Sequence, residues 1–377
     1  MIKVSRGCLG DDELRRVRQV FDTGYFGHSS TVLEFESMLK RYLGAEYVVA
    51  TNTGTSALHL ALEALGIGKD DEVIVPSLTF VASFQAIFAT GATPVPCDVA
   101  PDTLLMDVND AERRITPRTK ALMPVHYTGN SCDMDALRRI AHNRDIRVLE
   151  DAAHAFGSTY NGRRIGSFGD VACFSFDSIK NITCGEGGAV VCREGDLAER
   201  LRRKRTLGIN RDANPQAPDK HQPWRFDVST GGFRYHMSGI NAAIGLVQLD
   251  KADSFIARRR EICRRYDASF RLIDGLQTLR INYDESAPHI YVVRVQDGRR
   301  DALMQFLREA EIETGINYIP NHFHPLFQHP GFALPETERA FGEILTLPLH
   351  CALSDSDVDA VISRVLAFFE NGVRCKR

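Results

Sequence analysis

Residues 46–66, EYVVATNTGTSALHLALEALG, decide the fold class of this chain. EYVVAT is typical of a short strand, and ALHLALEAL is a helical pattern that Gly66 closes. Gly54 allows a tight turn between the two. Because the first-turn N–H groups of a helix lack helical partners and attract anions, Gly54, Thr55 and Ser56 are candidates for binding a phosphate. The alternative is an ordinary N-cap without a ligand.

The alternation of strands and helices continues and predicts an α/β fold, with a mostly parallel sheet covered on both faces. In such sheets ligands bind at the carboxyl ends of the strands. A long helical stretch over 238–270 then leads into a smaller α+β pattern, so we predict a large domain over 1–245 and a small domain over 246–377. Predicted strands cover 46–51, 71–76, 93–98, 120–127, 146–151, 170–176, 187–192, 289–295 and 344–350, and further helices 83–91, 133–145, 196–208, 301–312 and 355–371.

The composition is that of a globular protein of two or three domains. The chain has 377 residues, of which 44% are hydrophobic and 25% charged, and a net charge of −3. This balance counts against a nucleic-acid surface. The uncharged stretch Val73–Cys97 is interrupted by Pro76, Gly91 and Pro94, so we expect a buried strand–helix–strand there rather than a membrane span.

The cysteines and the N-terminus predict the compartment. The nine cysteines include no CxxC pair. We expect scattered thiols of a reducing compartment rather than a disulfide framework or a zinc site. Residues 1–16 contain no apolar signal region and turn acidic early, so the cytoplasm is the expected location.

Two segments place chemistry at predicted strand ends. In VLEDAAHAFGS, Asp151 follows an apolar strand, where a carboxylate can hold a pyridinium or a ribose, unless it only caps a helix. His154 lies three residues later and can share a helical face with it, or serve structure alone. In FSFDSIKNITCGEGG, Lys180 follows a buried strand, and Ser175 on that strand can offer a hydroxyl to a phosphate.

Together these segments indicate a pyridoxal phosphate (PLP) enzyme. A semi-buried lysine has a lowered pKa and forms an imine with a carbonyl, although a solvated loop lysine is the alternative for Lys180. PLP supplies an electron sink, and the protein supplies the imine-forming lysine and an acid that keeps the pyridine nitrogen protonated. A phosphate cradle, an acid at a strand end and a lysine on a later turn are the required parts.

The chain resembles the DegT/DnrJ/EryC1/StrS family of sugar aminotransferases over nearly its whole length. The likeness rests on TGYFGHSSTVLEFESMLKRYLGAEYVVATNTGTSALHLAL, VPSLTFVASFQAI, the Asp151 segment, SFDSIKNITCGEGG, INAAIGLVQL and LPLHCALSDSDV, in the family's order. It implies fold-type I, with a seven-stranded sheet and a smaller C-terminal α+β domain. It also implies a homodimer whose active sites take residues from both subunits.

The resemblance assigns roles by matched position. Lys180 matches the lysine that forms the imine with PLP, and Asp151 matches the partner of the pyridine nitrogen. His154 matches a position near the phenolic oxygen of PLP, and Phe80 matches the aromatic that stacks on its ring. The phosphate-binding positions are matched by Thr55, Ser56 and Ser175.

One segment departs from the family pattern. In GGFRYHMSGINAAIGL, Arg234 stands where the family usually has Asn, and His236 stands where it has Arg. The usual Asn reaches the phosphate in the neighbouring subunit, and Arg234 can make that contact with charge assistance. Alternatively, Arg234 binds an acidic group of the substrate.

Other polar segments are less specific. GINYIPNHFHPLF carries His322 and His324, with His329 nearby, but we expect no metal there; Tyr318 or His322 can contact the sugar, or be structural. The basic run over 200–205 is expected to be a solvated helix face, with attraction of a nucleotide diphosphate as the alternative. The segment 207–235 is predicted to be a functional or interface loop.

We therefore predict a PLP-dependent aminotransferase that moves an amino group from L-glutamate to a nucleotide-linked keto-deoxyhexose, in amino-sugar biosynthesis such as that of lipopolysaccharide. An acidic ketosugar, such as an 8-keto-octulosonate, or a cyclitol is the alternative acceptor, because of Arg234. A PLP-dependent sugar dehydratase is a second alternative, against which Lys180 argues because the family's dehydratases carry His there. A PLP-binding regulator is a third, against which the lack of a DNA-binding extension counts.

Overall fold

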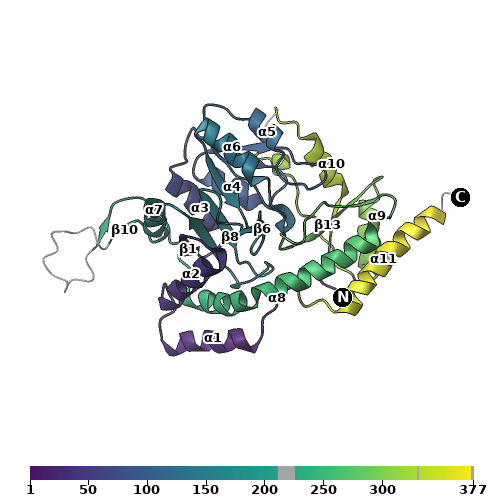
Figure 1. Ribbon diagram of the computed structural model, residues 1–377, viewed down its shortest axis with the longest axis horizontal. Coiled ribbons are helices and arrows are strands. Elements are labelled where there is room, and N and C mark those ends of the chain that lie inside the picture. Colours follow the sequence, from purple (N-terminus) through teal and green to yellow (C-terminus); the bar gives the residue numbers. More distant parts are fainter. Residues whose placement is uncertain (211–225, 329–330, 375–377) are drawn as a thin grey trace.

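The computed structural model describes residues 1–210, 226–328 and 331–374. Its centre is a seven-stranded sheet in the order β1-β9-β8-β5-β4-β2-β3 (Figure 1). β9 runs antiparallel to both neighbours, and the other pairs are parallel, so the predicted α/β fold is confirmed. The strands are β1 (Tyr47–Thr51), β2 (Glu72–Pro76), β3 (Thr93–Cys97), β4 (Thr119–Leu122), β5 (Arg147–Asp151), β8 (Val171–Ser175) and β9 (Gly188–Cys192).

Helices cover both faces of this sheet because alternate strand residues point to opposite sides. On one face Val49, Val73 and Val190 pack with α3 (Gly54–Leu65), α4 (Val81–Ala89) and α7 (Gly195–Arg205). On the other face Val48 and Val191 pack with helices α2 (Ser30–Leu43) and α8 (Gly239–Phe270). That second face is completed by α5 (Val108–Arg113) and α6 (Met134–Arg144).

The C-terminal part builds a second, smaller sheet. Its antiparallel strands are β12 (Leu276–Thr278), β13 (Tyr291–Val295) and β14 (Ile344–Leu347), and its helices are α9 (Arg300–Glu309), α10 (Pro335–Glu343) and α11 (Asp355–Arg374). α8 runs along both parts (Figure 1), so the predicted division at 245/246, which stays a prediction, falls inside this helix. At the other terminus, Ile2 forms a β-bridge with Ile312.

Most predicted elements are present, with some differences in length. The strand predicted over 120–127 ends at Leu122, because Pro124 has no N–H to continue the ladder. Val73–Cys97 forms β2, α4 and β3, as predicted, and no helix in the described part of the chain is long and apolar enough to cross a membrane. The remaining elements are α1 (Asp11–Asp22), the pairs β6 (Thr159–Tyr160) with β7 (Arg163–Arg164) and β10 (Ile209–Asn210) with β11 (Asp227–Val228), and 3-10 turns at Tyr127–Gly129 and Asn321–Phe323.

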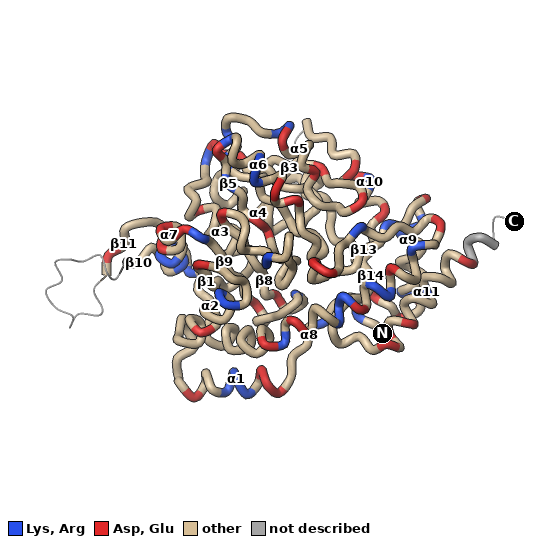
Figure 2. Tube along the Cα trace, in the orientation of Figure 1, with Lys and Arg blue, Asp and Glu red and all other residues tan. Residues whose placement is uncertain are grey.

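The basic run over 200–205 differs from its prediction at its last residue. Basic residues gather along α7 (Figure 2), and Arg200 and Arg202 are exposed. Arg205 is instead 3% exposed: it forms an ion pair with Glu36 on α2 and donates a 2.8 Å hydrogen bond to the carbonyl oxygen of Ala50 on β1. The run therefore is not a uniform solvated face. The predicted loop over 207–235 is described only at its ends, and residues 211–225 lie outside the described residues.

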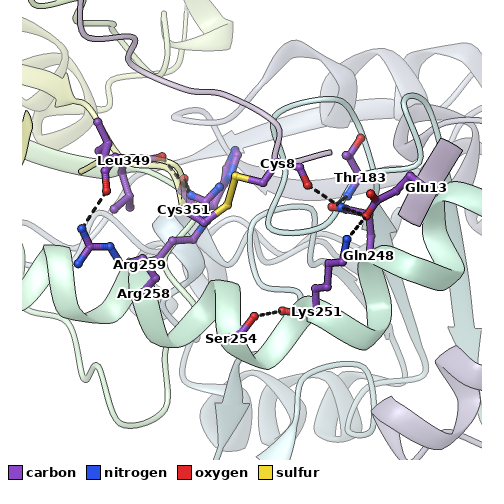
Figure 3. The surroundings of a disulfide bond; sticks show 12 residues. Cys8, Glu13, Thr183, Gln248, Lys251, Ser254, Arg258, Arg259, Leu349 and Cys351 are labelled. Carbon is purple, nitrogen blue, oxygen red and sulfur yellow. Dashed lines mark hydrogen bonds and ion pairs between the residues drawn. A yellow bond between two sulfur atoms is a disulfide. The ribbon is translucent and has the colours of Figure 1, made fainter. Parts of the chain in front are cut away.

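The prediction that the cysteines are scattered thiols is wrong for one pair. Cys8 and Cys351 form a disulfide beside α8 (Figure 3). The two lie 343 residues apart, so spacing carried no signal of the pairing. The bond fastens the segment before α1 to the loop after β14, and the carbonyl oxygen of Cys8 accepts a hydrogen bond from Gln248 on α8. Free and buried are Cys97, Cys132, Cys173, Cys184, Cys192 and Cys263.

Candidate active site

A cavity of about 600 Å³ lies at the carboxyl ends of the central strands, where an α/β sheet places its ligand. The first turn of α3, the turns that follow β2, β5 and β8, and the segment 317–318 from the C-terminal part enclose it. Its lining residues include Thr53, Gly54, Thr55, Thr79, Phe80, Ser83, Asp151, Ala153, His154, Ser175, Asp177, Lys180, Glu186, Asn317 and Tyr318.

The first turn of α3 forms one end of the cavity. Thr53 caps the helix, its Oγ1 accepting the Ser56 N–H at 3.0 Å, so that the backbone at 54–55 opens onto the cavity. A Cβ added at Gly54 would lie 2.7 Å from the Ser175 Cβ, so only glycine leaves the helix turn and the serine this close. The free N–H groups and the Ser175 hydroxyl suit an anion.

Asp151 is the buried acid of the cavity. It is the last residue of β5, is 4% exposed, and its Oδ2 accepts a 2.7 Å hydrogen bond from Ser83 Oγ. Its Oδ1 accepts the N–H of Ala153 at 3.1 Å. Burial raises the pKa of Asp151, and the Ser83 bond, the Ala153 bond and the charge of Lys180 act against that rise. The carboxylate is therefore held ready for a cationic partner.

Lys180 lies in the turn between β8 and β9. Burial lowers its pKa to about 8, and the charges of Asp151 and Asp177 only partly oppose that effect. No described carboxylate lies within ion-pair distance of its Nζ. A buried amine that is partly neutral near pH 8 is a competent nucleophile for a carbonyl. The predicted alternative, a solvated loop lysine, is not what the structure shows.

Two aromatic groups and a histidine complete the cavity wall. His154 Nε2 lies 2.9 Å from the Tyr318 hydroxyl. Burial, followed by the charge of Lys180, holds the pKa of His154 well below its usual range, so the ring is neutral. Phe80 is 53% exposed, and its ring centroid lies 5.5 Å from that of Tyr318. An exposed aromatic at a cavity is available to stack on a planar ligand.

Three predicted residues are not brought into this cavity. The Ser56 hydroxyl is turned away, donating to Asn52 Oδ1 at 2.6 Å. His322 is buried elsewhere, with Nδ1 2.7 Å from Ser77 Oγ and Nε2 3.5 Å from a Glu338 carboxylate oxygen, so we no longer expect it to contact substrate. Arg234 is exposed and lies outside the cavity of its own chain.

The histidine-rich segment around His322 and His324 was expected to bind no metal. The parts of the chain that the structure describes contain no group of three or more His, Cys, Asp or Glu side chains that could hold a metal ion. His329 lies outside the described residues.

The sequence reasoning missed several lining or supporting residues. Ser83 lies three residues after Phe80, in the first turn of the helix that begins at Val81. This position brings the Ser83 hydroxyl to Asp151. Asp177 and Glu186 flank Lys180 in sequence, but acidic residues in a loop carry no signal that they line a cavity. His289, which contacts Lys180, lies 109 residues away along the chain.

Residues 7–366 match the DegT/DnrJ/EryC1/StrS aminotransferase family. The chain belongs to this family. It is 39% identical to the spore coat polysaccharide biosynthesis protein SpsC of Bacillus subtilis strain 168, over 95% of this chain and 94% of that protein. The aminotransferase TlmJ from Streptoalloteichus hindustanus has a similar structure, with a TM-score of 0.91, 38% identity, and 97% and 98% of the two chains covered.

The putative sugar aminotransferase Spr1654 from Streptococcus pneumoniae is a further structural relative. Its pyridoxamine phosphate form has a TM-score of 0.93 and 32% identity to this chain, covering 98% of this chain and 100% of that one. Spr1654 has also been solved in a PLP form and an apo form. The DegT/DnrJ/EryC1/StrS family is PLP-dependent, so this chain is a PLP-dependent aminotransferase, as predicted.

The cavity fits PLP on its own evidence. The backbone at Gly54 and Thr55, with Ser175, offers donors for a phosphate, and a single Cβ at Gly54 would obstruct that end. Asp151 is a buried carboxylate suited to a protonated ring nitrogen. His154 adds a buried Nδ1 that has no hydrogen-bond partner among the described residues. Which of these residues contact the cofactor stays a prediction.

Proposed function

We propose that this enzyme transfers an amino group from L-glutamate to a ketosugar, with a nucleotide-linked keto-deoxyhexose as the acceptor. The observation that carries the proposal is that buried Asp151 and partly neutral Lys180 line the same cavity. The names of relatives support a sugar acceptor: SpsC is a polysaccharide biosynthesis protein, and PseC of Helicobacter pylori, 27% identical, is an aminotransferase of pseudaminic acid biosynthesis. In this proposal the amino sugar is used to build a surface polysaccharide, such as lipopolysaccharide.

Each side chain has a defined task in this proposal. PLP, when bound, supplies an electron sink that stabilises the carbanion formed at the reacting carbon. Lys180 would hold the cofactor, and its Nζ, once free, would take the Cα proton of the amino donor. Asp151 keeps the ring nitrogen protonated, with Ser83 keeping that carboxylate charged. The backbone at 54–55 and Ser175 anchor the phosphate, and Phe80 covers one ring face.

The lining of the cavity bears on the acceptor. Besides Lys180, its charged side chains are those of Asp151, Asp177 and Glu186. Two carboxylates near the reacting lysine favour hydrogen bonds to sugar hydroxyls and repel an acidic sugar. The alternative acceptor, an acidic ketosugar such as an 8-keto-octulosonate, therefore depends on Arg234 being supplied by another subunit. A cyclitol carries no charge for these carboxylates to repel. A panel of acceptors distinguishes a cyclitol from a ketosugar as the substrate.

The visible spectrum of the purified enzyme tests the reaction. We expect an absorbance band of covalently bound PLP that bleaches when L-glutamate is added and returns with the correct ketosugar. Lys180→Ala should lack the band, whereas Lys40→Ala, an exposed lysine on α2, should keep it. A band that persists under glutamate would point to another donor or to dehydration. A panel of neutral and acidic ketosugars and cyclitols then identifies the acceptor class.

We further propose a homodimer with shared active sites, located in the cytoplasm. Apolar side chains at the cavity, Phe80 and Ile179, are 53% and 37% exposed, as expected of a surface that a second subunit covers. Cys97, Cys132, Cys173, Cys184, Cys192 and Cys263 are free and buried, which supports a reducing compartment, whereas the Cys8–Cys351 disulfide counts against it. If Arg234 serves the neighbouring site, a mixed dimer of inactive Lys180→Ala and Arg234→Ala subunits has one intact site of its two. Random mixing makes about half of the dimers mixed, so about a quarter of wild-type activity should return. No recovery on mixing would place Arg234 elsewhere.

A further inference from the structure

His289 lies directly behind the reactive lysine. Its Nε2 is 3.4 Å from Lys180 Nζ, and its side chain is buried, with the residue 2% exposed. It is contributed by the C-terminal part of the chain, two residues before β13, and it is not among the residues that line the cavity. His289 therefore contacts Lys180 without itself lining the cavity that a ligand would occupy.

The backbone of His289 is fixed on both sides. Its N–H donates a 3.0 Å hydrogen bond to the Thr128 carbonyl oxygen. Its own carbonyl oxygen accepts a 3.0 Å bond from Arg259, a fully buried arginine of α8 that also donates to the Leu349 carbonyl oxygen. The imidazole packs on His154 with ring centroids 4.4 Å apart. These backbone bonds and the packing on His154 hold the imidazole beside Lys180.

The titratable groups that face His289 are all basic. Lys180 approaches from the turn after β8, His154 from the turn after β5 and Arg259 from α8. Burial, followed by the charges of these three groups, holds the pKa of His289 well below its usual range. The imidazole is therefore neutral at pH 7 and has a lone pair to offer. Beyond these groups, Asp151 and Asp177 act on Lys180.

We propose that His289 is a positioning residue for Lys180: its neutral Nε2 accepts a hydrogen bond from the ε-amino group whenever that group is not attached to the cofactor. The bond holds the freed lysine beside the reacting carbon, from which it can exchange a proton and later reattach. No covalent bond changes in this step. The inference rests on the proposed amino transfer, because only a reaction that releases the lysine requires a place to hold it.

The direction of the expected change in the Lys180 pKa follows from the lysine being the hydrogen-bond donor. A hydrogen bond accepted from an ammonium group favours its charged form and so raises the lysine pKa. His289→Leu removes the acceptor, and the pKa of free Lys180 should fall by about one unit, a shift equal to about tenfold in the protonation equilibrium. His289→Gln keeps an acceptor on a side chain of similar reach and should restore most of the wild-type value. A residue needed only for packing would not discriminate between a leucine and a glutamine in this way.

The test measures the lysine itself. Enzyme loaded with pyridoxamine phosphate, which leaves Lys180 free, is labelled with trace acetic anhydride across a pH series, and acetylation of the Lys180 peptide is followed by mass spectrometry. His350→Leu, at a buried histidine after β14, is the matched control and should leave the Lys180 pKa unchanged. Thermal melts of all variants confirm that they are folded.

The outcomes separate the two proposals. A lower Lys180 pKa in His289→Leu, restored in His289→Gln, supports the positioning role. An unchanged pKa in a folded His289→Leu enzyme, or the same fall in both variants, overturns it and leaves the proposed function intact. A wild-type enzyme that neither binds pyridoxamine phosphate nor bleaches with L-glutamate overturns the proposed function, and the positioning role with it.

Discussion

Ser83 Oγ lies 2.7 Å from Asp151 Oδ2, although the two residues are 68 positions apart. Ser83 occupies the first turn of α4, and Asp151 ends β5, so the contact exists because a helix that follows one strand begins over the end of another. Both side chains are buried. In a site where burial raises the pKa of Asp151, this hydroxyl is the largest influence that keeps the carboxylate charged.

Ser83→Ala should therefore weaken catalysis without removing PLP. A hydrogen bond to a charged group contributes about 1.5–3 kcal/mol, so we expect kcat to fall by roughly tenfold or more. Because the Asp151 pKa rises when the bond is lost, the acid limb of the pH–rate profile should move to higher pH. Steady-state kinetics across pH 5–9 measures both effects. Ser254→Ala, at an exposed serine of α8, should match wild type; an unmoved acid limb in Ser83→Ala would contradict the role assigned to the bond.

Gly54→Ala should lower the affinity for PLP. The added Cβ would meet the Ser175 Cβ at 2.7 Å, so either the serine or the first turn of α3 must shift at the phosphate end of the cavity. We expect the dissociation constant of PLP from refolded or resolved enzyme to rise at least tenfold, measured by the absorbance of bound PLP. The matched control is Gly342→Ala, since a Cβ at that helical glycine meets nothing within 4 Å. Equal affinities of the two variants would show that the cradle tolerates the methyl group.

Lys180 should destabilise the cofactor-free protein, by an amount that depends on pH. Its pKa is about 8 in the folded chain, against a usual 10.5. Between these values the unfolded chain binds the proton that the folded chain has lost, so stability rises with pH over this window. Lys180→Met should thus be more stable than wild type by roughly 3 kcal/mol at pH 7, a gain that shrinks towards pH 10.5. Denaturant melts of both apoproteins at pH 7 and 10 measure it, and a difference independent of pH would argue that the lysine is not desolvated.

The Cys8–Cys351 pair should be visible by peptide mapping. Without reductant, digestion should release the Cys8 peptide joined to the Cys351 peptide, and reductant should separate them. Closing so long a loop typically stabilises a protein by about 2–4 kcal/mol, so Cys351→Ser should lower the melting temperature. Reductant should lower it in wild type but leave Cys351→Ser unaffected. Finding both peptides free in oxidised enzyme would show that the two thiols only lie close together.

The sequence predicted the sheet well, and the predicted residues Lys180, Asp151 and Gly54 line one cavity for a physical reason. Lys180, Asp151 and Gly54 all lie where a strand meets a turn, and in an α/β sheet such positions converge on one edge. Tyr318, from the C-terminal part of the chain, was predicted and lines the cavity, but His289, from the same part, was not predicted. His289 precedes an unremarkable apolar strand, and only the packing of the two sheets brings it to Lys180.

Two predicted site residues do not line the cavity of their own chain, for equally local reasons. His322 and Ser56 are polar residues near functional positions, and their side chains are satisfied by neighbours, Ser77 and Asn52, that no linear pattern reveals. Helix α2 was not predicted, although Val32, Phe35, Leu39 and Leu43 follow a helical period and are all buried.

Helix α8 has 32 residues, which at 1.5 Å per residue makes a rod of about 48 Å that both sheets share. Its first half packs under the large sheet, and its second half carries Arg259 and Tyr266 into the small one. Because this continuous helix belongs to both parts, the enzyme cannot be divided between them into two halves that are expressed separately. Anyone who exchanges the C-terminal parts of two family members, to graft one acceptor preference onto another, must join the chimera inside a continuous helix and keep its rotational phase.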